Sequence, residues 1–482
     1  TIRGNEFKNI VLPGGVYDDE ASFVFIFALQ ANIPIVFENN TFDNIQSGEN
    51  GLGLKVNAKA EFTLNELNLQ FRNCQFINSN TNVQNGGGLG ISNTQFANGI
   101  KLSIEDSEFK NNHATSNGGG LCIDHASSIS ITNSRFIENH ADLRGGAIYV
   151  DDDKAFAACP ENLATTPYMT ISGCKFERNT AGEYGNAIFV NDDCQTQLYA
   201  IENNEFVDNF NHDCPIDYHI VSRKFPINIK TNTFTNTDGS QVNKIYYFDV
   251  EYDGLTIVNH TEPIEIFAND KHKFIKNCRF IDCCTESFVI ILHKLEDFVF
   301  ENNTIEFTDD FGCGNTGGVL VDIDTTATSG SKLLAEEDLF TFRNITLKNC
   351  VTGKTHPSGG YAIKVSKPLD MLFDQTKVLF SGSKHACGIN LYYKQTSIFR
   401  DCEFSNCHME DHQLGSAIYS HKTAEATGAS LMEGEDEFVI ENTDFSHNQA
   451  SANNFLFECD SGNVRYVNNI INIESEGSNS LS

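Results

Sequence analysis

Residues 131–150 read Ile-Thr-Asn-Ser-Arg-Phe-Ile-Glu-Asn-His-Ala-Asp-Leu-Arg-Gly-Gly-Ala-Ile-Tyr-Val, and this stretch decides the fold. It opens on the pattern apolar-x-Asn-x-x-Phe, which Ile131, Asn133 and Phe136 fill. It closes on a glycine pair that leads into a short apolar run. Both halves recur along the chain although the residues between them do not. Recurrence at intervals of about 20 to 50 residues is typical of a solenoid.

The first half of this pattern has fifteen copies, if aliphatic residues are allowed for Phe and small or acidic residues for Asn. We call the last residue of each copy its anchor. The anchors are Phe7, Phe42, Phe76, Phe109, Phe136, Phe176, Phe206, Phe234, Phe280, Ile305, Leu347, Val378, Phe404, Phe445 and Ile471. Because they are separated by 25 to 46 residues, the repeat is too irregular for a leucine-rich or propeller fold.

Each copy is built from strands. Alternating segments such as Leu102-x-Ile104 precede the anchors, and this period of two is typical of a half-buried strand. A second strand follows each anchor after glycines that fit a tight bend of positive φ, as at Gly145. The sequence therefore predicts an all-β parallel β-helix of about fifteen turns with loop insertions. Stacked turns place the Phe anchors in one internal column and the Asn residues in a buried ladder.

The glycine half and the spacing Phe-x-x-Asn together resemble the repeats of polymorphic outer membrane proteins and of related pectin-lyase-like surface proteins of protists. Phe136 to Asn139 and Phe176 to Asn179 carry this spacing, and residues 76–210 carry the resemblance best. The resemblance implies a right-handed parallel β-helix exposed on a cell surface, often with an adhesive role. No outer-membrane barrel domain is visible in the sequence.

The repeat predicts a single domain over residues 1–474, followed by a polar tail at 475–482. Long intervals between copies predict insertions at about 152–168, 238–273, 324–338 and 422–437. Three of the four follow a glycine strand, so we expect them to emerge along one side, where recognition loops are commonly placed. The motif reaches both ends of the sequence, so we expect head-to-tail self-assembly or a longer parent chain.

Charge and hydropathy limit the partners. The formal net charge is −32, which argues against binding to nucleic acid because a phosphate backbone needs clustered Lys and Arg. The longest apolar run, residues 23–29, is too short to span a bilayer, so we expect no membrane insertion of this segment.

The sequence has fifteen cysteines and four Asn-x-Ser/Thr sequons. Cys74, Cys174, Cys278 and Cys402 each precede an anchor by two residues in turns too far apart for disulfides, which predicts buried thiols. Cys159 and Cys194 follow equivalent strands of adjacent turns, so a disulfide between them is predicted. Among the sequons, Asn39, Asn302 and Asn344 fall in the ladder that we expect to be buried. Asn259 is therefore the predicted glycosylation site.

Two groups of side chains are candidates for metal binding. Asp124, Asp151, Asp152 and Asp192 end the glycine strands of consecutive turns, so stacked carboxylates there could bind Ca²⁺. The alternative is a solvated acidic edge that discourages aggregation of the sheet. His113 and His140 each lie four residues beyond an anchor, close enough to share a metal ion. Since zinc needs three or four ligands, the favoured interpretation of this pair is surface polar residues.

No catalytic motif or cofactor site is recognisable. Glycoside hydrolysis needs two or three carboxylates at defined separations, and the His-Gly dipeptide typical of polygalacturonases is missing. We therefore expect a non-enzymatic structural or adhesive β-helix, extracellular or at a cell surface, that binds protein or glycan through loops on one face. One alternative is a carbohydrate-active enzyme with an atypical site. Another is an intracellular, filament-associated structural protein.

Overall fold

The computed structural model contains strands but no helix in the part of the chain that it describes. The described residues are 1–12, 34–47, 55–56, 67–81, 85–92, 100–124, 126–152, 166–192, 199–211, 218–222, 227–237, 244–246, 252–261, 263–266, 274–285, 287–293, 298–308, 316–322, 339–350, 361–366, 369–380, 385–393, 396–409, 417–422, 437–445, 448–449, 457–459, 464–471 and 473–474. Nothing helical within these ranges has the length and hydropathy that crossing a bilayer requires.

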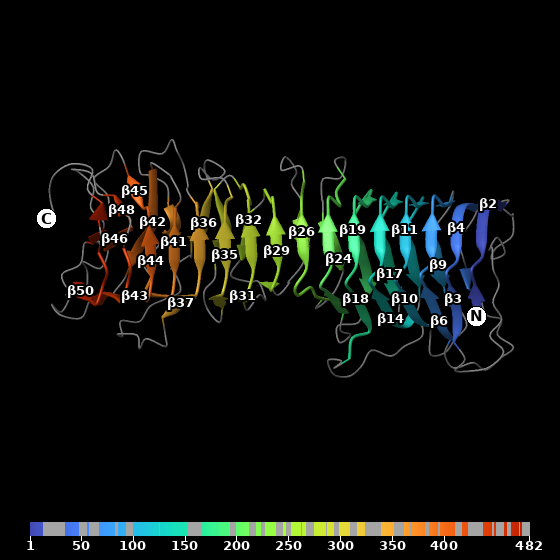
Figure 1. Ribbon diagram of the computed structural model, residues 1–482, viewed down its shortest axis with the longest axis horizontal. Helices are drawn as coiled ribbons and strands as arrows, with labels where there is room; N and C mark the ends of the chain where they lie inside the picture. Colours follow the sequence, from blue (N-terminus) through green and yellow to red (C-terminus); the bar gives the residue numbers. More distant parts are fainter. Residues whose placement is uncertain are drawn as a thin grey trace. The chain divides into compact units, whose positions relative to one another are not determined.

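The chain forms two compact units, residues 1–238 with 242–250 and residues 239–241 with 251–482. Each unit is described by itself, and the prediction of one uninterrupted domain stays a prediction. In both units a turn visits three parallel sheets in the same order. Figure 1 shows the strands of the second sheet standing side by side within each unit, as at β4, β11 and β19 in unit 1.

In unit 1 the first sheet contains β1 (Ile2–Arg3), β3 (Ile35–Glu38), β6 (Leu67–Arg72), β10 (Ile100–Glu105), β14 (Ala126–Thr132), β18 (Met169–Ser172), β22 (Tyr199–Glu202) and β25 (Ile227–Asn228). The second contains β2 (Glu6–Leu12), β4 (Thr41–Ser47), β7 (Gln75–Ile77), β8 (Asn80–Thr81), β11 (Glu108–Lys110), β12 (His113–Ala114), β15 (Arg135–Ile137), β16 (His140–Ala141), β19 (Lys175–Glu177), β20 (Thr180–Ala181), β23 (Glu205–Val207) and β26 (Thr233–Thr235). The third contains β5 (Lys55–Val56), β9 (Leu89–Ser92), β13 (Leu121–Asp124), β17 (Ile148–Asp152), β21 (Ile188–Asp192), β24 (Tyr218–Ser222) and β27 (Lys244–Tyr246).

Unit 2 repeats this order. Its first sheet contains β28 (Tyr252–Asp253), β31 (Phe274–Lys276), β34 (Val299–Glu301), β37 (Phe340–Arg343), β40 (Met371–Asp374), β43 (Thr396–Arg400), β47 (Glu437–Glu441) and β50 (Val464–Val467). The second contains β29 (Thr256–Val258), β32 (Arg279–Ile281), β35 (Thr304–Glu306), β38 (Thr346–Lys348), β41 (Lys377–Leu379) and β44 (Glu403–Ser405). The third contains β30 (Ile264–Ile266), β33 (Phe288–Leu292), β36 (Gly317–Val321), β39 (Tyr361–Val365), β42 (His385–Tyr393), β46 (Ile418–Lys422) and β49 (Phe457–Cys459). Two further pairs join β45 (His408–Met409) to β42 and β48 (Asn448–Gln449) to β51 (Ile473–Glu474).

The predicted Phe column is confirmed in unit 1. Phe109, Phe136 and Phe176 are fully buried and pair in register between successive turns. Their ring centroids are 4.7 and 5.1 Å apart, with the planes inclined by 4° and 8°. This spacing follows from the strand separation of about 4.8 Å and gives each ring two offset-stacked neighbours.

The Asn ladder is confirmed as a ladder but was wrongly predicted to be buried. Asn39, Asn73 and Asn133 are exposed and have φ near +50°, where Asn is one of the few tolerated residue types. The side-chain amide of Asn73 donates to the Asn39 Oδ1 at 2.7 Å, along the outside of the turn. The residue that follows in these copies points inward instead: Asn40, Cys74 and Ser134 are buried.

A second ladder, three residues beyond the anchors, is buried. Asn112, Asn139, Asn179 and Asn209 are at most 1% exposed. The Asn139 Nδ2 donates to the carbonyl oxygen of Phe109 and to the Asn179 Oδ1, both at 2.9 Å. Such a chain of satisfied amides closes the bend that follows these four anchors.

The stretch 238–273, predicted as an insertion, contains a regular turn. Strands β28, β29 and β30 lie within it and pair in register with the next turn, so that Ile257 faces Phe280. Ile257 is thus an anchor that adds one copy to the fifteen, and it divides the longest interval into two equal parts. This anchor was not recognised in the sequence because Gly254 stands where the pattern has Asn, and Leu255 stands where other copies have a small residue such as Cys or Ser.

Candidate metal centre

His113 and His140 occupy equivalent positions of adjacent turns. Each follows an Asn of the buried ladder and precedes a buried Ala, so the alternation along β12 and β16 directs both imidazoles outward. The two histidines are paired in the strand register, and their ring centroids are 5.1 Å apart. The backbone amide of His140 donates to the carbonyl oxygen of Asn112 at 2.8 Å, which fixes one strand on the other.

The glycines that precede the third-sheet strands pack against the backbone of β12 and β16. A β-carbon on Gly119 would overlap the carbonyl oxygen of His140, and one on Gly87 would lie 2.7 Å from that of His113. Close approach of two backbones therefore requires these two glycines. The preceding residue of each run, such as Gly118 with φ +69°, is the one that makes the predicted positive-φ bend.

Asp142 completes the cluster. Its Oδ1 lies 2.8 Å from the Nε2 of His113 and 3.1 Å from the Nε2 of His140. At the opposite edge of the His140 ring, the Nδ1 lies 2.7 Å from the Thr180 Oγ1. Within the described ranges, this is the one group of three potential metal ligands whose donor atoms all lie within 4.8 Å of one another. We call His113, His140 and Asp142 the histidine cluster.

The protonation of His140 is set by competing effects. Burial and the neighbouring His113 lower the pKa of His140, whereas Asp142 and Thr180 oppose that shift through hydrogen bonds and charge. The net direction is downward, so the neutral imidazole that can accept a metal ion is favoured. Sequence reasoning found the two histidines but missed Asp142. The available signal was His-x-Asp, which places both side chains near one bend of the chain.

The predicted calcium site is only partly described. Asp124 pairs in register with Asp151, as the sequence predicted, and Asp151 pairs with Asn191 of the following turn. The Asp151 carboxylate accepts hydrogen bonds from the Asn191 Nδ2 at 2.9 Å and from the Tyr149 hydroxyl at 3.1 Å. Asp152 and Asp192 also pair in register, but their side chains lie outside the described part of the structure. Calcium binding by these residues stays a prediction.

One of the two cysteine predictions is confirmed, and the other falls outside the described residues. Cys74, Cys174, Cys278 and Cys402 are buried free thiols, as predicted. Burial raises the pKa of Cys174, Cys278 and Cys402 to about 12, which leaves these thiols unreactive near neutral pH. The predicted disulfide between Cys159 and Cys194 falls on residues outside the described ranges. Cys284 is disulfide-bonded, which the sequence did not predict.

Three sequons were excluded as glycosylation sites because they were predicted to be buried, and that prediction is wrong. Asn39, Asn302 and Asn344 are exposed, since they belong to the outer ladder of left-handed residues. Asn259 is half-buried and takes the same left-handed conformation at φ +55°, within the regular turn formed by β28 to β30. Glycosylation of Asn259 stays a prediction. Burial gives no reason to prefer Asn259 over the other three sequons, because those three are more exposed.

Comparison with known proteins decides the handedness of the solenoid. Residues 26–221 match the family model described as "Right handed beta helix region". This region is a right-handed parallel β-helix. The match covers most of unit 1 and agrees with the parallel, in-register strands of that unit. No curated protein and no solved structure matches the chain.

Proposed function

We propose that this β-helix is a non-enzymatic structural or adhesive scaffold, extracellular or at a cell surface, that binds protein or glycan through inserted segments. The proposal rests on one observation. The corner at which the chain passes from the third sheet to the first sheet of the next turn is crossed by segments of very different length.

In unit 1, a single residue, 125, joins β13 to β14. One turn later, residues 153–168 join β17 to β18 across the equivalent corner. In unit 2, residues 394–395 join β42 to β43, whereas residues 322–339 and 423–436 make the same connection in other turns. The fold closes this corner with one or two residues, so the longer segments are not needed to continue the helix. Segments added to a rigid scaffold at one repeated position are typical of recognition surfaces.

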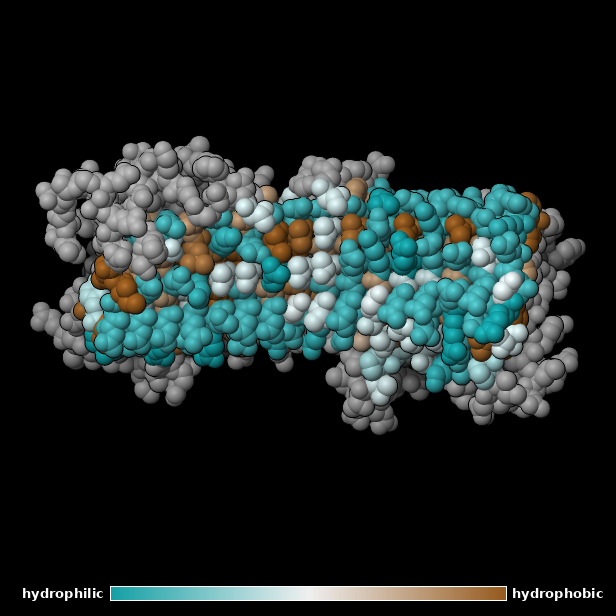
Figure 2. Space-filling model, viewed as in Figure 1, coloured by the Kyte–Doolittle hydropathy of each residue, from teal (hydrophilic) through white to brown (hydrophobic). Residues whose placement is uncertain are grey.

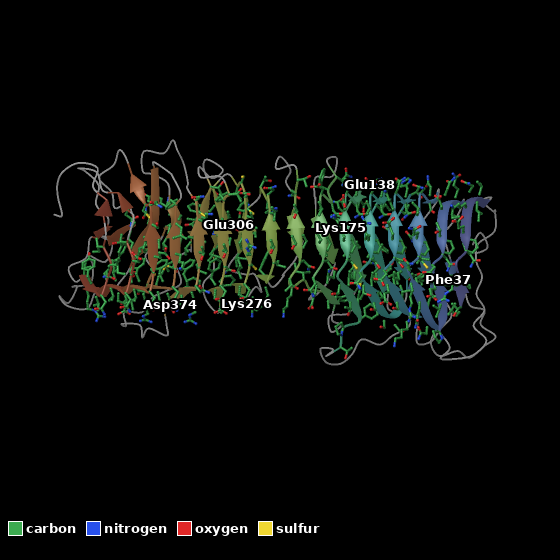
Figure 3. All side chains as sticks on the ribbon, in the orientation of Figure 1. Phe37, Glu138, Lys175, Lys276, Glu306 and Asp374 are labelled. Atoms are coloured by element: carbon green, nitrogen blue, oxygen red, sulfur yellow. The ribbon has the colours of Figure 1, made fainter. Side chains whose placement is uncertain are left out.

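The surface of the described turns supports a scaffold role. Many charged side chains are neutralised by a partner in the next turn, as in the pairs Arg135 with Glu108 at 3.2 Å and Arg279 with Glu306 at 2.7 Å. Lys175 and Glu138, labelled in Figure 3, both belong to unit 1 and pair within this pattern, Lys175 with Glu205 at 3.7 Å and Glu138 with Arg178 at 2.9 Å. Figure 2 shows that the viewed face of each unit is mostly hydrophilic, with small apolar spots. Isolated pairs of this kind contribute little stability.

Three observations favour an extracellular location. Cys284 is disulfide-bonded, and disulfides persist mainly in oxidising compartments. The sequons at Asn302 and Asn344 are exposed. The repeat also resembles that of polymorphic outer membrane proteins, whose relatives act at cell surfaces. Head-to-tail self-assembly stays a prediction.

Shortening the corner segments tests the proposal. One variant joins Asp152 to Met169 through a single His, copying the connection at residue 125. A second joins Lys422 to Glu437 through Lys-Gln, copying residues 394–395. We expect both variants to keep the far-UV circular dichroism and thermal midpoint of the parent. Binding of the parent to an array of glycans and extracellular-matrix proteins should be lost in at least one of them.

Three outcomes contradict the proposal. Unfolding of both variants would show that the segments belong to the fold. Cleavage of a polysaccharide by the parent chain, seen as new reducing ends or unsaturated sugars, would favour the carbohydrate-active enzyme. Binding that survives in a chain with these two segments and residues 322–339 all shortened would place recognition on the sheets.

A further inference from the structure

We propose that the histidine cluster, His113, His140 and Asp142, binds one divalent first-row transition-metal ion of the zinc class. The inference rests on the geometry of these three side chains and is independent of the adhesive role proposed above. Its starting point is the convergence of three donor atoms: both Nε2 atoms approach the same oxygen of Asp142, at 2.8 and 3.1 Å.

The donor set selects the class of metal. Two imidazoles and one carboxylate suit Zn²⁺, Ni²⁺ or Cu²⁺, whereas Ca²⁺ and Mg²⁺ prefer oxygen ligands alone. The affinity of nitrogen and oxygen donors rises toward Cu²⁺ and remains high for Zn²⁺. Among the described residues, none besides these three forms a cluster with this donor composition and spacing.

The distances fit a metal-bound state after a small displacement. Bonds of about 2.0 to 2.1 Å in a tetrahedron place two ligand atoms about 3.3 Å apart. The two present N to O separations are shorter by a few tenths of an ångström, which is the hydrogen-bonded arrangement of the same three groups. Because the side chains of His113, His140 and Asp142 are 35%, 42% and 45% exposed, they can open by that amount without disturbing the core.

Thr180 orients the second imidazole. Its Oγ1 lies 2.7 Å from the His140 Nδ1, so this nitrogen can donate to the hydroxyl while the Nε2 faces the metal position. A hydrogen bond to the second ring nitrogen is the usual support of a metal-binding histidine, because it fixes both tautomer and ring orientation. Thr180 stands in register with His140 in the next turn, so the strand pairing supplies this partner.

Three protein ligands leave a coordination position open. Zinc sites of this kind complete their tetrahedron with water or with a group from another molecule. The cluster lies at the surface, so that position is accessible to a water molecule or to a carboxylate or imidazole of a binding partner.

Calorimetric titration of the full chain with Zn²⁺, after treatment with a chelator, tests the inference. We compare the parent with His113→Ala, His140→Ala and the matched control His293→Ala. His293 also faces a carboxylate, that of Glu265 at 3.7 Å, but belongs to no three-ligand group in the described structure. The expected result is that each cluster variant loses one equivalent of bound Zn²⁺, whereas His293→Ala keeps it. Circular dichroism verifies that the variants are folded.

Thr180→Val provides a second readout that a nonspecific acidic surface would not give. It should retain the stoichiometry but weaken the affinity by about 10- to 100-fold. The proposal is overturned if both histidine variants bind as many equivalents as the parent, with unchanged affinity. Unchanged affinity in Thr180→Val would overturn the orientation of His140 by Thr180. With Co²⁺ in place of Zn²⁺, the parent should show visible d–d absorption that both histidine variants lack.

Discussion

Replacing Asn139 by Ala removes one member of the buried ladder in the middle of unit 1. Its Oδ1 accepts the backbone amide of Asn112 at 3.2 Å and the Asn112 Nδ2 at 2.9 Å. Its own Nδ2 donates to the Phe109 carbonyl and to Asn179. The substitution therefore removes four buried hydrogen bonds and leaves groups on two neighbouring turns without these partners.

The expected loss of stability is large. Each hydrogen bond contributes a net of about 1 kcal/mol, so four predict a loss of about 4 kcal/mol in the free energy of unfolding. Asn133→Ala is the matched control, since it makes the same change in the same turn at an exposed position. Its cost is about 1 kcal/mol, because Ala tolerates the left-handed conformation less well than Asn.

Urea unfolding followed by far-UV circular dichroism compares the two variants, and hydrogen exchange localises the effect. A buried amide deprived of its acceptor loses about 1 to 3 kcal/mol. At about 1.4 kcal/mol for each factor of ten, exchange of the Asn112 amide should accelerate about 5- to 150-fold in Asn139→Ala. In Asn133→Ala the same amide should exchange as in the parent. Equal unfolding midpoints for the two variants, with an unchanged Asn112 amide, would refute the reasoning.

Three further predictions concern the Phe column, the buried thiols and the outer ladder. Phe136→Leu, which keeps the anchor apolar but breaks two stacked pairs, should lower stability by about 1 to 3 kcal/mol and the thermal midpoint with it; an unchanged midpoint would show that stacking adds nothing to burial. Because burial raises the pKa of Cys174 and Cys402 to about 12, the stability present below the ordinary thiol pKa is lost as pH rises from about 9 toward 12. Native thiols should therefore resist iodoacetamide at neutral pH, as peptide mass spectrometry can show, and labelling as fast as in urea would contradict their burial. Expression through a secretory pathway should place glycan on the exposed Asn302 and Asn344. If Asn259 carries glycan while Asn302 and Asn344 do not, exposure does not make these two residues glycosylation sites.

Much of the fold could be predicted because its determinants are local and repeat. The Phe at the anchor marks the inward position of a strand, and the glycine run marks the next strand, so residues 131–150 alone contain the second-sheet strands of one turn and the start of its third-sheet strand. The anchor at Ile257 was missed because it keeps the apolar spacing without the Asn, which is the most visible part of the pattern. Spacing of buried positions is the physical requirement there, and the polar signature is optional.

Burial of the Asn residues could not be read from their recurrence. Asn133 and Asn139 lie in one turn and both recur in ladders, yet one is exposed and the other is fully buried. The difference arises from backbone conformation: Asn133 has φ +49°, which turns its side chain outward along the bend. A sequence indicates that Asn is needed in either case, through its tolerance of this conformation or through its two-sided hydrogen bonding.

The histidine cluster illustrates the same limit. The equal distance of His113 and His140 from their anchors predicted their proximity, and register pairing confirms it. Asp142 was missed because its approach depends on the bend after β16, which no periodic pattern specifies. Thr180 was also missed, although it lies four residues beyond the anchor Phe176, the same offset that predicted the proximity of the two histidines.

Zero-length cross-linking of Lys to carboxylates in the native protein tests the in-register stacking of turns most directly. The structure places the Lys175 Nζ 3.7 Å from Glu205 and the Lys377 Nζ 2.9 Å from Glu403, each pair belonging to successive turns. Peptide mass spectrometry should therefore find the links 175–205 and 377–403. Absence of both links, together with a link from Lys175 to Glu108 two turns away, would contradict this register and the β-helix built on it.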